Sequence, residues 1–264
     1  EALGLKKLIS TSYAPESKAY KGGIPLTLFE TDSPKFDADK SKTHGKIFIL
    51  EKNNTSDGKL DLDDLQWDYL EGDGDFRSDE VKKLRDESDI IVTNPPFSLF
   101  REFLYWIMEA NKHFISIGPL NAVTYKEVFP LVRGGVIWNG KGFNGGNAFF
   151  HSPDSRKYAE GVYNEETGLI KFRNCSWFTN IEHGHRHRPL QLMSMVDNIK
   201  YSKHKTIKGN GYVHYDNYDA IEVPFTDAIP DDFSKMMGVP ISFFDKYCPE
   251  QFEIVGITKT WYGM

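Results

Sequence analysis

Short apolar runs, rich in β-branched residues, alternate with polar and amphipathic segments along the first half of the chain. Apolar runs bounded by turn residues predict strands, and apolar residues at helical spacing predict the helices between them. Strands that alternate with helices are typical of a parallel α/β sheet. The strands predicted in this way occupy residues 7–13, 46–51, 67–71, 90–92, 113–117 and 134–138.

Two helices are predicted around the strand at 90–92. Ser78 is a good helix cap and two acids follow it, so the first helix begins there and ends near Ser88. The second helix begins at Ser98 and has one apolar face, which is more typical of a core than of a binding surface. The members of that face are Phe100, Phe103, Leu104, Ile107 and Met108. A third, short helix is predicted at 123–132.

The second half of the chain has weaker signals. Residues 139–172 are rich in Gly and Asn and contain no strong helix signal. The apolar run at 174–180 predicts a strand, which we expect to pair antiparallel with the strand ending at Trp138. In the proline-containing tail, residues 238–244 predict a small folded module, and residues 15–45 predict a loop.

The strand at 90–92 leads through Thr93 into Asn94-Pro95-Pro96-Phe97. The prolines stop the strand, so a side-chain amide is held on a stiff backbone at the carboxyl end, where open α/β sheets bind ligands. The Asn94 side-chain oxygen and the Pro95 carbonyl could accept both N–H groups of an exocyclic amine such as that of adenine. Phe97 could stack on the base. This pattern favours amino-group methylation, and the plain alternative is a Pro-Pro turn with a core Asn and a core Phe.

Residues 72–76, Gly-Asp-Gly-Asp-Phe, form a second candidate site after a strand. A carboxylate there could accept a hydrogen bond from an adenine amino group, and Phe76 could stack on the ring. A polar turn with Phe76 in the core explains the same residues equally well.

Composition narrows the possible functions. The 264 residues carry a net charge of −6, which argues against an indiscriminate nucleic-acid binder but leaves room for a local basic face. Only two cysteines occur, which suits a reducing cytoplasm and excludes a cysteine-rich zinc site. No apolar run approaches the roughly 18 residues of a membrane span. The acidic turn at 61–64 lacks the bidentate Glu of an EF-hand, so calcium is not expected.

Basic residues cluster twice in the second half of the chain. Residues 182–188 alternate histidines with arginines; the spacing matches no zinc signature, so a phosphate-contacting loop or a solvated loop is expected rather than a metal site. The second cluster follows residue 199 and precedes several tyrosines, a mixture that suits either nucleic acid or a solvated face. The candidate DNA-binding residues of the two clusters are His185, Arg186, Arg188, Lys203 and Lys205.

With these pieces in order, the chain resembles the EcoRI-type family of adenine-N6 DNA methyltransferases. The resemblance is carried by residues 74–80 (GDFRSDE), 92–102 (VTNPPFSLFRE) and 175–180 (CSWFTN). The Asn-Pro-Pro-aromatic motif alone is shared with methyltransferases that act on RNA or on protein glutamine. The resemblance implies a class I, Rossmann-like methyltransferase fold with a mostly parallel sheet and an antiparallel last strand. It also implies a catalytic domain at 1–190 and a target-recognition, DNA-binding module at 191–264.

The family's functional residues carry over where the motifs match. Asn94, Pro95, Pro96 and Phe97 match the catalytic motif, and Asp75 and Phe76 match the site for the adenine of S-adenosylmethionine, with Asp73 as a competitor. The expected substrate is an adenine flipped out of double-stranded DNA. No metal is expected, and a monomer in the cytoplasm is expected. The enzyme is expected either to belong to a restriction-modification system, with a cognate nuclease as its partner, or to act as an orphan enzyme without one. The alternatives are an RNA or protein-glutamine methyltransferase and a non-catalytic DNA-binding relative.

The chain departs from the family pattern in its cofactor motifs. The family's first cofactor motif, a strand and a tight turn, has no counterpart, because Gly22-Gly23 does not follow a suitable strand. The strand at 7–13 ends without the acid that commonly holds the cofactor ribose, and Glu16 is the nearest one. We therefore expect that the natural protein has residues before Glu1.

Overall fold

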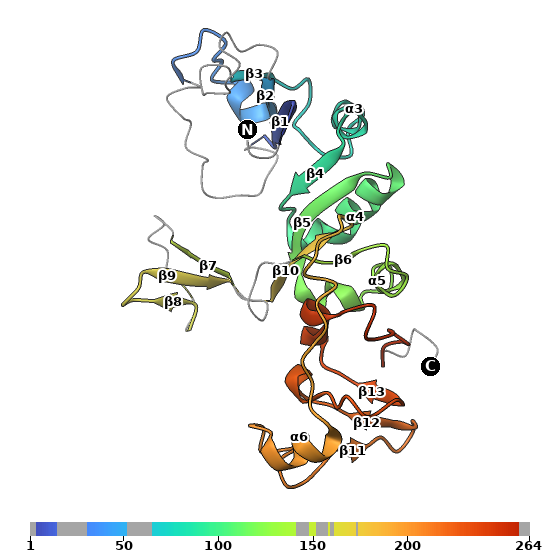
Figure 1. The fold of residues 1–264 in the computed structure, drawn as a ribbon. Helices are drawn as coiled ribbons and strands as arrows, with labels where there is room; N and C mark the ends of the chain where they lie inside the picture. The colour runs from blue at the N-terminus through green and yellow to red at the C-terminus, as the bar shows by residue number, and fades with distance from the viewer. Residues whose placement is uncertain are drawn as a thin grey trace. The chain divides into compact units, whose positions relative to one another are not determined.

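The computed structural model describes residues 4–14, 31–51, 65–140, 148–151, 158, 161–172 and 174–258 (Figure 1). The chain forms two compact units. The N-terminal unit contains residues 1–89 and 106–112, and the C-terminal unit contains residues 90–105 and 113–264. The predicted turns at 53–58 and 61–64, together with Glu16 and Gly22-Gly23, lie outside the described residues.

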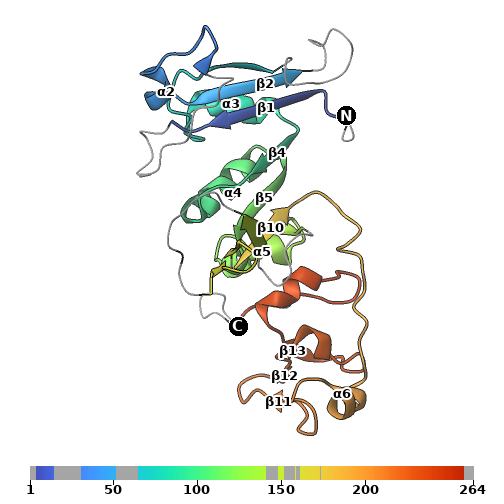
Figure 2. The same ribbon diagram turned by 90° about the vertical axis from the view of Figure 1, so that its left-hand side faces the viewer.

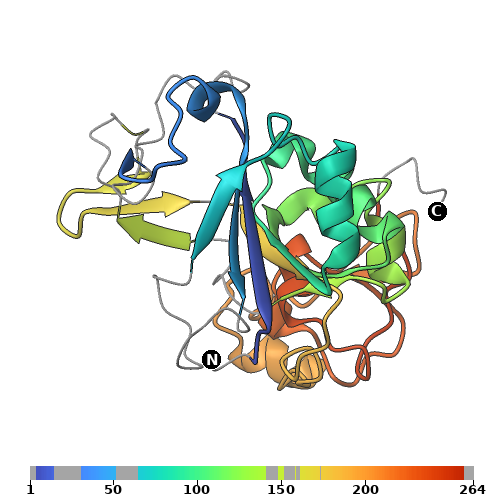
Figure 3. The same cartoon turned by 90° about the horizontal axis from the view of Figure 1, so that it is seen from above.

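The N-terminal unit contains a three-stranded sheet in the order β1 (Lys7–Ser12), β2 (Lys46–Glu51) and β3 (Gln66–Tyr69) (Figures 2 and 3). All three strands lie where the sequence predicts them. Both pairings are antiparallel, so the expectation of parallel strands is wrong here. The described part of the β1–β2 connection contains α2 (Lys40–Thr43).

The predicted helix after Ser78 is confirmed as α3 (Asp79–Glu87), and the Ser78 hydroxyl accepts a hydrogen bond from the Val81 amide. The buried Arg85 attaches α3 to the rest of its unit. Its guanidinium donates to the Trp106 carbonyl at 2.8 Å and lies 5.0 Å from the Trp106 ring centroid. The start of this helix was therefore predictable from local capping, whereas its packing against Trp106 depends on residues far along the chain.

The main sheet of the C-terminal unit has the order β4 (Ile90–Thr93), β5 (His113–Pro119), β10 (Cys175–Thr179) and β6 (Trp138–Asn139). β4 and β5 are parallel, and β10 is antiparallel to both β5 and β6. The predicted antiparallel pairing of the strand at 174–180 is confirmed. The mostly parallel sheet is found only in part, because β4–β5 is the one parallel pair among the described strands of this sheet.

The helix after β4 begins later than predicted. Pro96 starts a 3-10 turn, η4 (Phe97–Leu99), in which the Leu99 amide donates to the Pro96 carbonyl, and α4 follows at Phe100–Glu109. Ser98 therefore lies inside η4 rather than at a cap. The predicted apolar face is confirmed as core at Phe100, Leu104 and Ile107, which are all buried.

Two shorter predictions near β6 need correction. The helix expected at 123–132 is divided into η5 (Leu120–Thr124) and α5 (Phe129–Arg133). The strand expected at 134–138 begins only at Trp138, because Gly135 adopts a φ of 64° and residues 134–137 form backbone turns onto α5. Left-handed φ values suit Gly and interrupt a strand.

Two further sheets complete the C-terminal unit. β7 (Ala148–His151), β8 (Tyr163–Asn164) and β9 (Leu169–Phe172) form an antiparallel sheet in the order β7-β9-β8, in a region where the sequence predicts no strand (Figure 1). The second of these sheets has the order β11 (Val213–His214), β12 (Ala220–Glu222) and β13 (Met236–Gly238). The same part of the chain also contains α6 (Met195–Tyr201), η6 (Thr226–Ala228) and η7 (Ile241–Lys246).

The predicted folded tail is confirmed, since Ile221, Val223, Ile229 and Phe243 form a buried cluster. No compact boundary falls at residue 190, so the functional division at that point stays a prediction. Among the described residues, no helix combines the length and the apolar character needed to cross a membrane.

Candidate active site

The Asn94–Phe97 segment leaves β4 at its carboxyl end, beside the parallel strand β5. Asn94 and Pro96 are exposed, Pro95 is buried and Phe97 is half-buried. Among the described residues, neither the Asn94 side chain nor the Pro95 carbonyl has a hydrogen-bond partner. The two acceptors named by the sequence are therefore free to bind an incoming amine.

Phe100 anchors this loop to the sheet. Its ring is 1% exposed and lies 4.9 Å, centroid to centroid, from the ring of Phe178 in β10. Gly118 of β5 allows the approach, because a Cβ at that position would lie 2.3 Å from Phe100 Cε2. The two prolines and this anchor together hold Asn94 on a fixed backbone, as positioning catalysis requires.

Phe97 has an aromatic neighbour that sequence reasoning missed. Its ring contacts Phe172 of β9 edge to face, with the centroids 5.8 Å apart and the planes at 75°. An edge-to-face contact fixes the orientation of a ring and leaves part of its face open. Phe97 is thus held in place and is still half-exposed for a planar ligand.

Asp75 lies in the tight turn of the N-terminal unit. Gly74 adopts a φ of 84° there, and a Cβ on it would collide with the Ser12 carbonyl oxygen. The Arg77 guanidinium donates two hydrogen bonds to the carboxylate of Asp75, at 2.9 and 2.6 Å, and Tyr13 donates a longer one. The bonds from Arg77 lower the pKa of Asp75, so its carboxylate is ionised at neutral pH.

Phe76 and Asp73 take mainly structural positions in the same turn. The Phe76 ring is 7% exposed and packs edge to face on Trp106 at 5.7 Å. The Asp73 carboxylate accepts the Asp75 amide at 3.0 Å. The geometry of Phe76 fits the core interpretation better than an open stacking surface. The Asp75 carboxylate already accepts four hydrogen bonds, three from Arg77 and a longer one of 3.4 Å from Tyr13.

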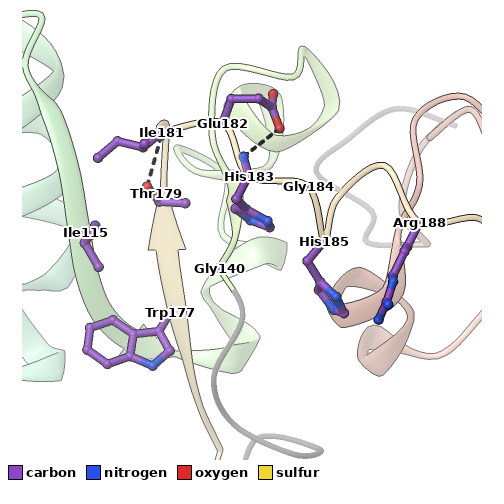
Figure 4. Close-up of a pocket in the computed structure, with 10 residues that line it drawn as sticks. All are labelled: Ile115, Gly140, Trp177, Thr179, Ile181, Glu182, His183, Gly184, His185 and Arg188. Atoms are coloured by element: carbon purple, nitrogen blue, oxygen red, sulfur yellow. Dashed lines mark hydrogen bonds between the residues drawn. The ribbon is translucent and has the colours of Figure 1, made fainter. Parts of the chain in front are cut away.

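The basic loop at 182–188 borders a cavity of about 640 Å³ in the C-terminal unit (Figure 4). Ile115 and Trp177 form an apolar part of the lining, and His183, His185 and Arg188 lie on the polar side. Arg186 does not line this cavity. Its guanidinium lies 4.0 Å from the centroid of the Trp138 ring and pairs with the Glu182 carboxylate at 2.8 Å.

The second basic cluster does not reach this cavity, since neither Lys203 nor Lys205 lines it. Lys203 pairs with Asp227 at 2.6 Å, and Lys205 is exposed. Within the described residues, no three His, Cys, Asp or Glu side chains are grouped as metal ligands would be.

Comparison with known proteins shows to which family the chain belongs. The model of a family described as "Adenine-specific methyltransferase EcoRI" matches residues 1–263. The chain belongs to the EcoRI family of adenine-specific methyltransferases. It is 37% identical over 260 residues to the type II methyltransferase M.EcoRI of Escherichia coli, a match that covers 97% of this chain and 72% of that protein.

Two mycoplasma relatives of this EcoRI-family chain are also called type II methyltransferases. M.MgeORF184P of Mycoplasma genitalium is 35% identical over 190 residues, which cover 70% of this chain and 57% of the relative. M.MpnI of Mycoplasma pneumoniae is 30% identical over 258 residues, which cover 96% and 67%. No solved structure matches the chain.

His187 ties the basic loop of this EcoRI-family protein to the C-terminal segment. Its Nδ1 lies 2.5 Å from a Glu250 carboxylate oxygen and its Nε2 lies 2.9 Å from one of Glu182. A carboxylate can only accept, so both ring nitrogens must carry protons and the ring is an imidazolium. The hydrogen bond to Glu250 contributes most to a raised pKa of His187, and the hydrogen bond to Glu182 contributes next.

We expect this tie to weaken at alkaline pH. A raised folded-state pKa means that the stabilisation is complete below about 6.5, the unfolded value, and is lost as pH rises through the folded value. The free energy of unfolding of wild type minus that of His187→Asn should therefore shrink between pH 6 and pH 9 in urea titrations. A difference that stays constant over this range would contradict the charged state assigned to His187.

Asp227 gives a second, opposite pH dependence. Burial alone would raise its pKa, but hydrogen bonds from Lys203 and His204 lower the pKa to about 2. The stabilisation from Asp227 is therefore present above about pH 4 and is lost as pH falls toward 2. Because the side chain is 43% exposed, we expect a modest loss, measured as a stability gap between wild type and Asp227→Asn that closes on acidification. A gap that widens below pH 4 would contradict this assignment.

Proposed function

We propose that this protein transfers a methyl group from S-adenosylmethionine to the N6 amino group of adenine in double-stranded DNA. The observation that carries the proposal is the free pair of acceptors on the loop after β4. The Asn94 amide and the Pro95 carbonyl have no partner among the described residues, and the Phe97 ring lies two residues beyond.

The chemistry of the amine explains why such a loop is needed. The adenine amino group is a poor nucleophile because its lone pair is delocalised into the ring. Acceptance of its two N–H groups by Asn94 and Pro95 favours a pyramidal nitrogen with an outward lone pair. Phe97 holds the base by stacking, and the fixed backbone supplies orientation before the reaction begins.

The cofactor supplies an electrophilic methyl group when it is bound. We assign its adenine part to Asp75 of the N-terminal unit, whose carboxylate is ionised and oriented by Arg77. A donor from the adenine would replace the long hydrogen bond of 3.4 Å from Tyr13. We assign Asp73 and Phe76 supporting places in the same turn. The class I arrangement of the sheet, implied by the family, belongs to this proposal as well.

A paired adenine cannot offer its amino group, so the target base must leave the duplex. His185 and Arg188, on the polar side of the cavity, are suited to contact a backbone phosphate, and Arg186 supports the loop through Trp138. Lys203 and Lys205 belong to residues 191–264, to which we assign target recognition. We place the enzyme as a monomer in a restriction-modification system with a cognate nuclease.

The test is a side-by-side transfer assay. The protein as its gene encodes it is incubated with cofactor labelled in the methyl group and with duplex DNA, RNA or a glutamine-containing protein substrate. The proposal expects label in DNA only. Label in RNA or in protein would support one of the alternative substrates, and DNA binding without transfer to any substrate would indicate a non-catalytic relative.

A further inference from the structure

The β7-β9-β8 sheet has two chemically different faces. Residues directly opposite each other in antiparallel strands share a face, and alternate residues change face. The register pairs Ala148 with Phe172, and Ile170 with both Phe150 and Tyr163. One face therefore holds only aliphatic and aromatic side chains, and we call it the aromatic face: Ala148, Phe150, Tyr163, Ile170 and Phe172. The opposite face holds Phe149, His151, Asn164, Leu169 and Lys171.

The aromatic face is partly open to solvent, and its Tyr163 ring stacks on the Tyr158 ring with the centroids 5.6 Å apart. Phe150, Tyr163 and Phe172 are 48%, 45% and 46% exposed. Single exposed apolar residues are ordinary, but a contiguous patch of rings marks a surface that binds something. The opposite face differs in its chemistry rather than in its exposure: Phe149 is 57% exposed, and the Lys171 ammonium lies 6.0 Å from the centroid of its ring.

The aromatic face is continuous with the catalytic loop. The Phe97 ring contacts Phe172 at 5.8 Å, and Phe172 in turn contacts Phe150 at 6.4 Å, again edge to face. A row of rings thus leads from Phe97 onto the sheet. Whatever occupies the face lies next to the substrate of Phe97.

We propose that the aromatic face binds the nucleotides that flank the target adenine, with their bases stacked on Phe150 and Tyr163. This inference depends on the proposed function, because it takes DNA as the substrate. Removal of one base from the duplex leaves its neighbours without a stacking partner, and any base can stack on an aromatic ring. Glu165 and Glu166 lie in the turn between β8 and β9, so the phosphates are expected to run near the Phe172 end.

The test compares the two faces of the same sheet. Phe150→Ala with Tyr163→Ala removes rings from the aromatic face, and Phe149→Ala is the matched control from the opposite face. Binding is measured by fluorescence anisotropy on a duplex that carries the methylation site, and base flipping by 2-aminopurine emission at the target position. Base–aromatic stacking corresponds to about 5- to 150-fold in affinity per base, so we expect at least about tenfold weaker binding by the double variant.

Each outcome decides the inference. Phe149→Ala is expected to bind within about twofold of wild type, and the double variant is expected to lose both affinity and the 2-aminopurine signal. Unchanged DNA binding by the double variant would overturn the inference. The same holds if sedimentation then shows that the aromatic face joins two copies of the chain, because its occupant would be protein and not DNA. Face-dependent DNA binding without any methyl transfer would instead overturn the proposed function and leave the aromatic face as a DNA contact.

Discussion

Asn94→Ala is expected to lower the rate of methyl transfer by about 100- to 1,000-fold, the usual effect of removing one preorganised polar group from a reacting centre. Asn94 is exposed and its side chain has no partner among the described residues, so the substitution leaves the fold intact. The loss should appear in the rate constant of methyl transfer under single-turnover conditions, while cofactor affinity measured by calorimetry stays near the wild-type value.

Asn111→Gly is a matched control for this substitution. Asn111 is also an exposed amide, and its φ of 51° suits glycine, so the change removes an amide group without strain. We expect wild-type activity from it. Near-normal transfer by Asn94→Ala, or an equal loss in both variants, would remove the amide from the mechanism.

Phe100→Ala is expected to cost about 3–5 kcal/mol in the free energy of unfolding, the range for large-to-small changes at buried aromatic positions. The ring is 1% exposed, packs on Phe178 and fills the space that Gly118 leaves open. Urea titration followed by circular dichroism measures the loss. Because Phe100 anchors the catalytic loop, transfer by the folded fraction should fall as well.

Tyr105→Ala provides the control on the same helix. Tyr105 is 70% exposed, and removal of an exposed side chain away from special contacts changes stability by about 0.5 kcal/mol or less. Phe100→Leu, which keeps an apolar group in the space, should lose clearly less than Phe100→Ala. Equal stability of Phe100→Ala and Tyr105→Ala would contradict the anchoring role of Phe100.

Local signals in the sequence predicted the parts of the fold that depend on neighbours in the chain. Ser78 predicted the start of α3, the spacing of Phe100 and Leu104 predicted the buried face of α4, and the Pro95-Pro96 pair predicted the end of β4. The antiparallel order of β1–β3 was not predicted, because pairing direction depends on how the chain returns between strands.

In the candidate site, too, only the features that depend on neighbouring residues in the chain were predictable. The position of Asn94 follows from its own strand and from the prolines after it. The contacts of Phe97 with Phe172, Arg186 with Trp138 and His187 with Glu250 join distant segments, and the local pattern does not reveal them. Phe76 is a further example. The motif predicts an aromatic ring in this turn, but the ring is buried because it packs on Trp106, which lies 30 residues along the chain.

The most direct measurement of the central claim is the identity of the methylated nucleoside. Duplex DNA is treated with the protein and cofactor, digested to nucleosides and separated by liquid chromatography with mass spectrometry. The two acceptors of the Asn94–Phe97 loop predict N6-methyladenine as the product, abundant with wild type and nearly absent with Asn94→Ala. A product methylated on cytosine, or N6-methyladenine at equal yield from both proteins, would contradict this account.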